Sequence, residues 1–106
     1  MSEHVIADRF EFEVAGCKHH LEDFARAEIK AGDQLSLETE PENPHDAHAI
    51  KVLKGGIHIG YVPAVLSASV AQIMSKYSGR LVVCLAGPAG CRVVMECWEK
   101  TAASKA

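Results

Sequence analysis

The sequence predicts a mainly β domain of about six short strands with one or two helices, folded as a small barrel or a curled antiparallel sheet. Several short stretches alternate apolar and polar residues with the period of a half-buried strand. Turn-forming Gly and Pro residues separate these stretches. Only one stretch carries a long apolar stripe with helical spacing. The chain has 106 residues, so we expect a single domain over 1–106.

The first predicted strand spans residues 9–16, because Phe10, Phe12 and Val14 alternate with acidic residues. The next stretch, residues 20–33, has apolar residues near helical spacing but is short. A short helix and an ordered loop fit this stretch equally well.

Three further strands are predicted in the middle of the chain, over residues 34–39, 49–53 and 57–62. Gly55 and Gly56 separate the last two, which is typical of a hairpin turn. The sequence therefore predicts that these two strands pair directly.

The main helix is predicted to begin at Pro63, where a missing N–H costs nothing, and to end at Gly79. Its apolar stripe consists of Leu66, Val70, Ile73 and Tyr77. This stripe predicts that one face of the helix packs on the core.

The last two strands are predicted over residues 80–86 and 91–98, joined by the turn GPAG. The run VVCLA within the first of them is strongly apolar, which predicts burial on both faces or a closed sheet. We expect the folded core to cover about residues 10–98, and residues 99–106 to form a flexible tail.

Composition and charge exclude several classes of function. Apolar residues make up 48% and charged residues 24% of the chain, which is ordinary for a globular domain. The net charge is −3, so a large basic surface for duplex nucleic acid is not expected. No run of about 18 apolar residues suggests a membrane span, and the N-terminus does not resemble a secretory signal. We expect a cytoplasmic protein in a reducing compartment.

The four cysteines contain no CxxC pair. In a reducing compartment we expect them to be buried thiols that behave as small apolar residues. They are Cys17, Cys84, Cys91 and Cys97.

The stretch EPENPHDAHAIKV, residues 40–52, is predicted to be a stiff loop followed by a strand. Pro41 and Pro44 each fix one φ angle and remove one N–H donor. The sequence predicts two roles for Asp46: it can close an Asx turn, or it can accept a hydrogen bond from a ligand hydroxyl. Both can hold, because a carboxylate has about four lone-pair positions.

The histidines and cysteines raise the alternative of a metal site. His45-x-x-His48 could supply nitrogen ligands, and His19, His20 and Cys17 could add others. The spacing is weak evidence, because Pro44 argues against a helix at that point. We expect His19 and His20 to follow a strand end and to point to opposite faces. Nothing in the sequence pairs a nucleophile with a base, and no phosphate-binding Gly-rich loop is present.

Three segments in order resemble the HIRAN domain family: VAGCKHH, GDQLSLETEPENPHDAHAIKV and GIHIGYVPA. The resemblance covers roughly residues 10–97. It implies a modified OB-like β-barrel without catalytic activity or a cofactor. It also implies capture of the 3′-hydroxyl end of single-stranded DNA, in DNA repair or replication-fork processing, with helicase or nuclease domains as partners.

The resemblance implies six ligand-binding residues. Asp46 would accept a hydrogen bond from the terminal hydroxyl, and Asn43 would bind near the terminal nucleotide. The others are His19 and His45 for base stacking, Lys18 for a phosphate, and Tyr61 near the nucleic-acid backbone. Because His titrates near pH 6.5, the two stacking positions predict tighter binding at pH 6 than at pH 8.

Some positions differ from the DNA-binding members of that family. Glu42 adds a negative charge, and Ala64 stands where many members carry a cation, which leaves Lys18 and Lys51 for phosphate contact. These differences favour an alternative function: a protein-interaction or targeting module with a vestigial DNA pocket. A small His/Cys metal-binding protein is a third possibility.

Overall fold

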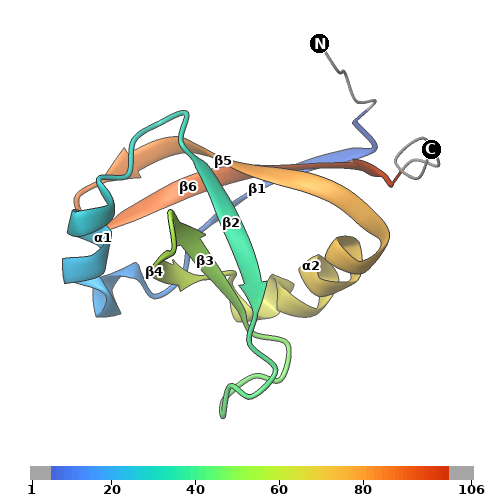
Figure 1. The fold of residues 1–106 in the computed structure, drawn as a ribbon, viewed down its shortest axis with the longest axis horizontal. Coiled ribbons are helices and arrows are strands. Elements are labelled where there is room, and N and C mark those ends of the chain that lie inside the picture. Colours follow the sequence, from blue (N-terminus) through green and yellow to red (C-terminus); the bar gives the residue numbers. More distant parts are fainter. Residues whose placement is uncertain (1–5, 101–106) are drawn as a thin grey trace.

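The computed structural model describes residues 6–100 as a curled antiparallel sheet of six strands with a helix at either end (Figure 1). The strands lie in the order β1-β6-β5-β2-β3-β4. The elements are β1 (Asp8–Glu13), the 3₁₀ turn η1 (Cys17–His19), α1 (Leu21–Ala27), β2 (Gln34–Thr39), β3 (Ile50–Lys54), β4 (Ile57–Tyr61), α2 (Ala64–Lys76), β5 (Tyr77–Gly87) and β6 (Gly90–Glu99). The predicted mainly β fold, with its six strands and a helix between the fourth and fifth, is confirmed.

The two edges of the sheet meet at one point. Ala15, just after β1, forms an antiparallel bridge with Tyr61 at the end of β4, with N–H to O distances of 2.7 and 2.8 Å. Gly60 permits this approach, since a Cβ there would lie 2.6 Å from the carbonyl oxygen of Ala15. The sheet is thus an OB-like barrel joined at one end and open along the rest of that seam.

The interior is built from the alternating residues that the sequence singled out. Phe12 and Val14 are buried, while the glutamates between and beside them are exposed. Val52 from β3 and Val70 from α2 are also buried, and Phe24 adds an aromatic ring from α1. The period-two pattern therefore identified the core face of the strands correctly.

The predicted boundary between the main helix and the fifth strand is wrong. The helix ends at Lys76, and Tyr77 already pairs with Glu99 of β6. Gly79 lies inside β5 and does not end the helix. The long partner β6 explains this, because pairing along its whole length overrides the helical spacing of Tyr77. Glu99, predicted to begin a tail, is the last residue of β6; residues 101–106 lie outside the described part of the chain.

The burial predicted for the run VVCLA is also wrong in part. Val83 is buried, but Cys84 is exposed and Leu85 is 65% exposed. The β5–β6 register shifts between Val83 and Leu85, and β2 pairs with β5 only as far along as Val82. The end of this hairpin therefore lacks a neighbouring strand to cover it, whereas the other three cysteines are buried as predicted.

The segment after β1 is a turn and a short helix. Its CKHH sequence forms η1 and the residue that precedes α1. The prediction that His19 and His20 follow a strand end and point to opposite faces is therefore wrong. Gly16 has φ 76°, a left-handed conformation that redirects the chain here. Between residues 6 and 100, no helix is long and apolar enough to cross a bilayer.

Candidate functional site

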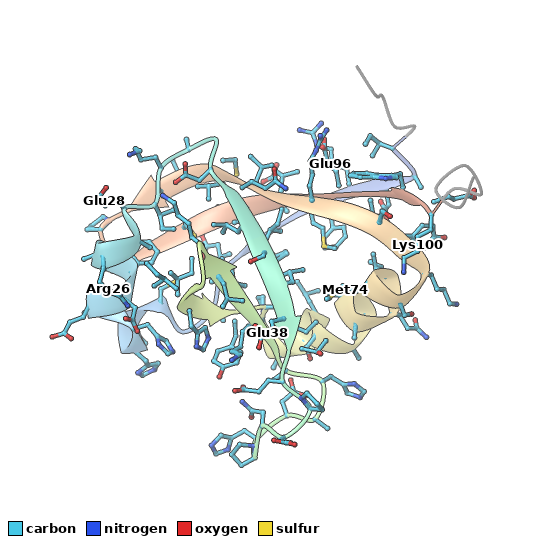
Figure 2. The ribbon with its side chains drawn as sticks, viewed as in Figure 1. Arg26, Glu28, Glu38, Met74, Glu96 and Lys100 are labelled. Atoms are coloured by element: carbon cyan, nitrogen blue, oxygen red, sulfur yellow. The ribbon has the colours of Figure 1, made fainter. Side chains whose placement is uncertain are left out.

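The loop between β2 and β3 projects from the barrel, and its fold is set by Asn43 (Figure 1). The side-chain oxygen Oδ1 of Asn43 accepts hydrogen bonds from the backbone N–H groups of His45, at 2.8 Å, and Asp46, at 3.1 Å. The backbone N–H of Asn43 donates to the carbonyl oxygen of Glu40 at 3.0 Å. Figure 2 labels Glu38 where β2 leads into this loop. The stiff loop predicted from its prolines is therefore also held by an amide side chain.

Asp46 closes the predicted Asx turn and contacts the main helix as well. Its Oδ1 accepts the backbone N–H of His48 at 2.8 Å, and its Oδ2 accepts the hydroxyl of Ser67 at 2.9 Å. These two hydrogen bonds, that of His48 first, lower the pKa of Asp46. Asp46 is thus a fixed carboxylate that still has lone pairs for a further donor.

Glu40 connects the loop to β4. Its Oε1 accepts hydrogen bonds from Nδ2 of Asn43, at 2.9 Å, and from the hydroxyl of Tyr61, at 2.8 Å. The same bonds, led by that of Asn43, lower the pKa of Glu40. Burial, and then the neighbouring Glu40 carboxylate, raise the pKa of Tyr61. Tyr61 is therefore a neutral hydroxyl whose orientation depends on a loop residue.

A hollow of about 230 Å³ lies between the loop, β4 and the start of α2. The lining residues are Ala15, Asn43, His45, Asp46, Ala49, Tyr61, Val62 and Ala64. Four of the six predicted ligand-binding residues thus share one hollow, with small apolar side chains beside them. Such a combination suits a ligand with an apolar face and a hydroxyl group.

Lys18 and His19 do not line this hollow. Both are exposed on η1 and border a separate hollow of about 350 Å³ with residues 20–23. His20 connects the two regions, because its ring centroid lies 4.6 Å from that of His58. The centroids of His58 and Tyr61 lie 4.8 Å apart, edge to face. This row of three rings leads from η1 to the wall of the first hollow.

The environment of His58 favours its neutral form. Burial, followed by the nearby His20, lowers the pKa of His58. The ring nitrogen Nε2 of His58 is 2.9 Å from the carbonyl oxygen of Gly60. Gly60 lies at the bridge between the two sheet edges. His58 therefore contacts the backbone at this bridge and also packs between the rings of His20 and Tyr61.

Sequence reasoning missed three residues of this site: Glu40, Ser67 and His58. Glu40 stands directly before Pro41, so its place in the predicted loop was a usable signal. Ser67 is only 2% exposed, and it contacts a residue 21 positions away, which no local pattern reveals. His58 alternates with two isoleucines in a predicted strand, and a lone polar residue there reads as a surface position.

Metal binding has little support in the described region. Within residues 6–100, no group of three His, Cys, Asp or Glu side chains could hold a metal ion. His45 and His48 are both exposed on the loop. The proposed His/Cys metal-binding function therefore has no assembled site there.

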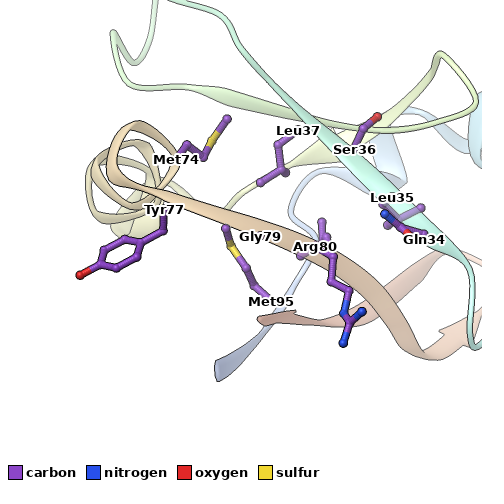
Figure 3. A pocket seen from close by; sticks show the side chains of 10 residues that line it. Gln34, Leu35, Ser36, Leu37, Met74, Tyr77, Gly79, Arg80 and Met95 are labelled. Atoms are coloured by element: carbon purple, nitrogen blue, oxygen red, sulfur yellow. The ribbon is translucent and has the colours of Figure 1, made fainter. Parts of the chain in front are cut away.

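Another hollow, of about 330 Å³, lies where β2 and β5 diverge (Figure 3). Leu37 and Met74 face it from β2 and α2, and Met95 borders it from β6. Only two residue pairs join β2 to β5, which leaves this gap between the strands. None of the six predicted ligand-binding residues lines it.

Comparisons with known proteins place this fold. A family model described as HIRAN domain matches residues 8–101. The crystal structure of the HIRAN domain of human HLTF superposes with a TM-score of 0.76 at 22% identity, covering 95% of this chain and 84% of that one. An NMR structure of the HLTF HIRAN domain in its DNA-bound conformation gives a TM-score of 0.66 at 22% identity, covering 97% and 84%.

A crystal structure of a protein from Lactobacillus plantarum shares the fold at 17% identity. Its TM-score is 0.72, over 92% of this chain and 97% of that one. No curated protein matches this chain by sequence.

Proposed function

This chain belongs to the HIRAN domain family, and on that basis we propose that it is a non-catalytic module that binds nucleic acid and captures the 3′-hydroxyl end of single-stranded DNA. The observation that carries the proposal is the shared hollow of Asn43, His45, Asp46 and Tyr61. The DNA-bound conformation of a structurally similar HIRAN domain supports nucleic acid as the ligand class.

The proposed recognition is a hydrogen bond from the terminal 3′-hydroxyl to the carboxylate of Asp46. The lowered pKa of Asp46 keeps it ionised and therefore able only to accept. A 3′-phosphate would place a second negative charge beside Asp46, in a loop that also carries the acidic residues Glu40 and Glu42. The hollow should therefore discriminate between these two ends by charge.

The remaining contacts would come from flat rings and a few cations. His45 borders the hollow, and His19 stands on η1 beyond the row of rings. Stacking on a side-chain ring contributes about 1–3 kcal/mol per base without sequence preference. Lys51 is 3.5 Å from Glu38, which reduces its value to a phosphate, whereas Lys18 is exposed. We therefore expect a shallow salt dependence, with a log–log slope of about −1.

The test is fluorescence anisotropy at low salt with two labelled single-stranded oligonucleotides that differ only at the 3′ end. We expect clear preference for the 3′-hydroxyl over the 3′-phosphate, and tighter binding at pH 6 than at pH 8 if imidazolium contacts a phosphate. Equal affinity for both ends would refute end capture, and an affinity flat across this pH range would refute the imidazolium contact.

A protein-interaction module is the second candidate. Val65, next to the hollow-lining Ala64, is 90% exposed at the start of α2, and Glu42 brings a negative charge to the facing loop. An apolar side chain beside acidic groups suits a basic or amphipathic peptide. Absence of binding to either oligonucleotide at low salt would favour this candidate.

If the chain binds DNA as proposed, we expect it to act in DNA repair or replication-fork processing, beside helicase or nuclease domains.

A further inference from the structure

The largest of the hollows described here has no part in the proposed function. Its volume is about 530 Å³, and it lies where the end of β1 and η1 meet the β5–β6 hairpin. Two cysteines, Cys17 of η1 and Cys91 of β6, both line it. The two cations on its border are Lys18 and Arg92.

The two thiols are both buried, and both border this hollow. Cys17 is 3% exposed and Cys91 is 6% exposed. Val14 ties them together: its N–H donates to the carbonyl of Cys91 at 3.0 Å, and its own carbonyl oxygen lies 3.8 Å from Sγ of Cys17. Each thiol is the main influence on the pKa of the other, as expected for neighbouring side chains: Cys91 lowers the pKa of Cys17, and Cys17 raises the pKa of Cys91.

We propose that Cys17 and Cys91 form a redox-active thiol pair, which hydrogen peroxide entering through this hollow oxidises to a disulfide between η1 and β6. The family assignment and the nucleic-acid proposal play no part in this inference.

The chemistry balances in two displacements. The Cys17 thiolate attacks one oxygen of hydrogen peroxide, the O–O bond breaks, and the departing hydroxide takes a proton to leave as water. Cys17 is then a sulfenic acid. The sulfur of Cys91 attacks the sulfur of Cys17, the S–O bond breaks, and the proton of the Cys91 thiol leaves with the hydroxyl group as a second water. Two thiols are oxidised, and one peroxide is reduced to two waters.

The same two displacements balance with Cys91 as the attacking residue. Cys17 and Cys91 line the same hollow, and each is followed in sequence by a cation that also lines it, Lys18 or Arg92. Since a nearby cation stabilises a thiolate, the geometry favours neither thiol for the first attack. Both steps need only groups that already adjoin the hollow.

The other two thiols serve as internal comparisons. Cys97 is buried against the backbone of Asp8, with Sγ 3.7 Å from the carbonyl oxygen, and burial raises its pKa. Cys84 is exposed, and its Sγ lies 3.4 Å from the carbonyl oxygen of Arg92. We expect Cys97 to stay reduced, and Cys84 to be the competing site of oxidation.

The experiment treats the whole chain with a small excess of hydrogen peroxide at neutral pH. Remaining thiols are alkylated in denaturant, and the protein is digested with trypsin without reduction. Cleavage after Lys and Arg places Cys17 in the peptide 10–18, Cys97 in 93–100, and both Cys84 and Cys91 in 81–92. Mass spectrometry should show 10–18 joined to 81–92, with the loss of two hydrogens, and separation of the two by dithiothreitol.

The variant Cys84→Ser shows which cysteine of peptide 81–92 is linked to Cys17, because this peptide contains both Cys84 and Cys91. Because Cys84 is exposed, this substitution should leave the fold intact, and the linked peptide pair should persist at unchanged yield. The same treatment in concentrated urea should scatter the links among all thiol pairs. Loss of the link in Cys84→Ser, a link to Cys97, or full alkylation of Cys17 and Cys91 after native oxidation would each overturn the proposal.

Discussion

In the proposed function, recognition of the 3′ end depends on Asp46, and the two hydrogen bonds that hold its carboxylate decide how this role can be tested. One oxygen accepts the N–H of His48 and the other accepts the hydroxyl of Ser67. An amide at position 46 retains an oxygen for the N–H of His48, so Asp46→Asn removes the charge while the Asx turn remains. The substitution should therefore change ligand binding while the loop keeps its fold.

For Asp46→Asn we expect affinity for the 3′-hydroxyl oligonucleotide to fall about tenfold or more, since a charge-assisted hydrogen bond is lost. Anisotropy titration measures this change, and urea unfolding checks that the fold is retained. The matched control is Glu42→Gln, which removes an exposed acidic charge from the same loop and should not weaken binding. Equal affinity of Asp46→Asn and the wild type would contradict the proposed contact.

Ser67 is a positioning residue that acts through Asp46. Ser67→Ala removes a buried hydroxyl that donates to Oδ2 of Asp46, and we expect a loss of about 1–2 kcal/mol in the free energy of unfolding. Ser69→Ala makes the same change at an exposed position of α2, so the difference in helix propensity cancels between the two. Urea denaturation of both variants gives the comparison. Equal stability of the two variants would show that the contact with Asp46 contributes nothing.

Among the elements, β4 and the segment after β1 determine how the barrel joins. The bridge between Ala15 and Tyr61 requires a residue without a side chain at position 60. A Cβ at Gly60 would lie 2.6 Å from the Ala15 carbonyl oxygen and 2.7 Å from Cγ1 of Val14. The same bridge aligns Tyr61 with the hollow, so the seam and the site are coupled.

We expect Gly60→Ala to destabilise the protein by about 1–3 kcal/mol, because the backbone at the seam must move apart. Gly90→Ala is the control: a Cβ there has no neighbour within 4 Å, and Gly90 has no left-handed φ that would penalise it. Thermal unfolding of both variants measures the difference. A Gly60→Ala variant as stable as Gly90→Ala would mean that the close approach is not needed.

The elements also show what sequence patterns could and could not predict. Sequence patterns found all six strands: period-two alternation predicted the earlier ones, and apolar runs bounded by turn residues predicted the last two. The same reasoning failed at Tyr77, which has helical spacing but pairs with β6, since a long-range partner decides its state. It failed at Leu85 because an apolar residue at the end of a hairpin has no neighbour to cover it.

The arrangement of the candidate site could also be predicted only in part, because sequence patterns group residues that are close in sequence and miss long-range contacts. The loop residues Asn43, His45 and Asp46 are close in sequence, so motif and stiffness identified them together. The contact of Asp46 with Ser67 and that of Glu40 with Tyr61 each span 21 residues, and only the folded chain reveals them. Lys18 and His19 were grouped with the loop by resemblance, yet they border another hollow.

For the whole molecule, protonation in acid lowers the free energy of unfolding in two stages that begin at different pH values. The folded pKa of His58 is lowered from its ordinary value of 6.5, so its contribution is fully present above that pH and is lost as the pH falls below it. The folded pKa values of Asp33, Glu40 and Asp46 are also lowered. Their contribution is fully present above about pH 4–5 and is lost as the pH falls through the folded values.

We therefore expect the free energy of unfolding to be nearly constant from pH 7 to 8 and to decline in two stages below that range. His58→Gln should remove the upper stage, which begins as the pH falls below about 6.5, and leave the lower stage unchanged. Urea unfolding across this range measures both stages. The same slope just below about pH 6.5 in the wild type and in His58→Gln would contradict the assignment to His58.

The proposed nucleic-acid site is the hollow formed by the loop, β4 and the start of α2. The most direct test is a titration of ¹⁵N-labelled protein with a short single-stranded oligonucleotide bearing a 3′-hydroxyl, followed by amide chemical shifts. We expect the largest shifts at the residues around this hollow: Asn43, His45, Asp46, Tyr61 and Ala64. Shifts confined to the β5–β6 hairpin, or no shifts at saturating oligonucleotide, would contradict it.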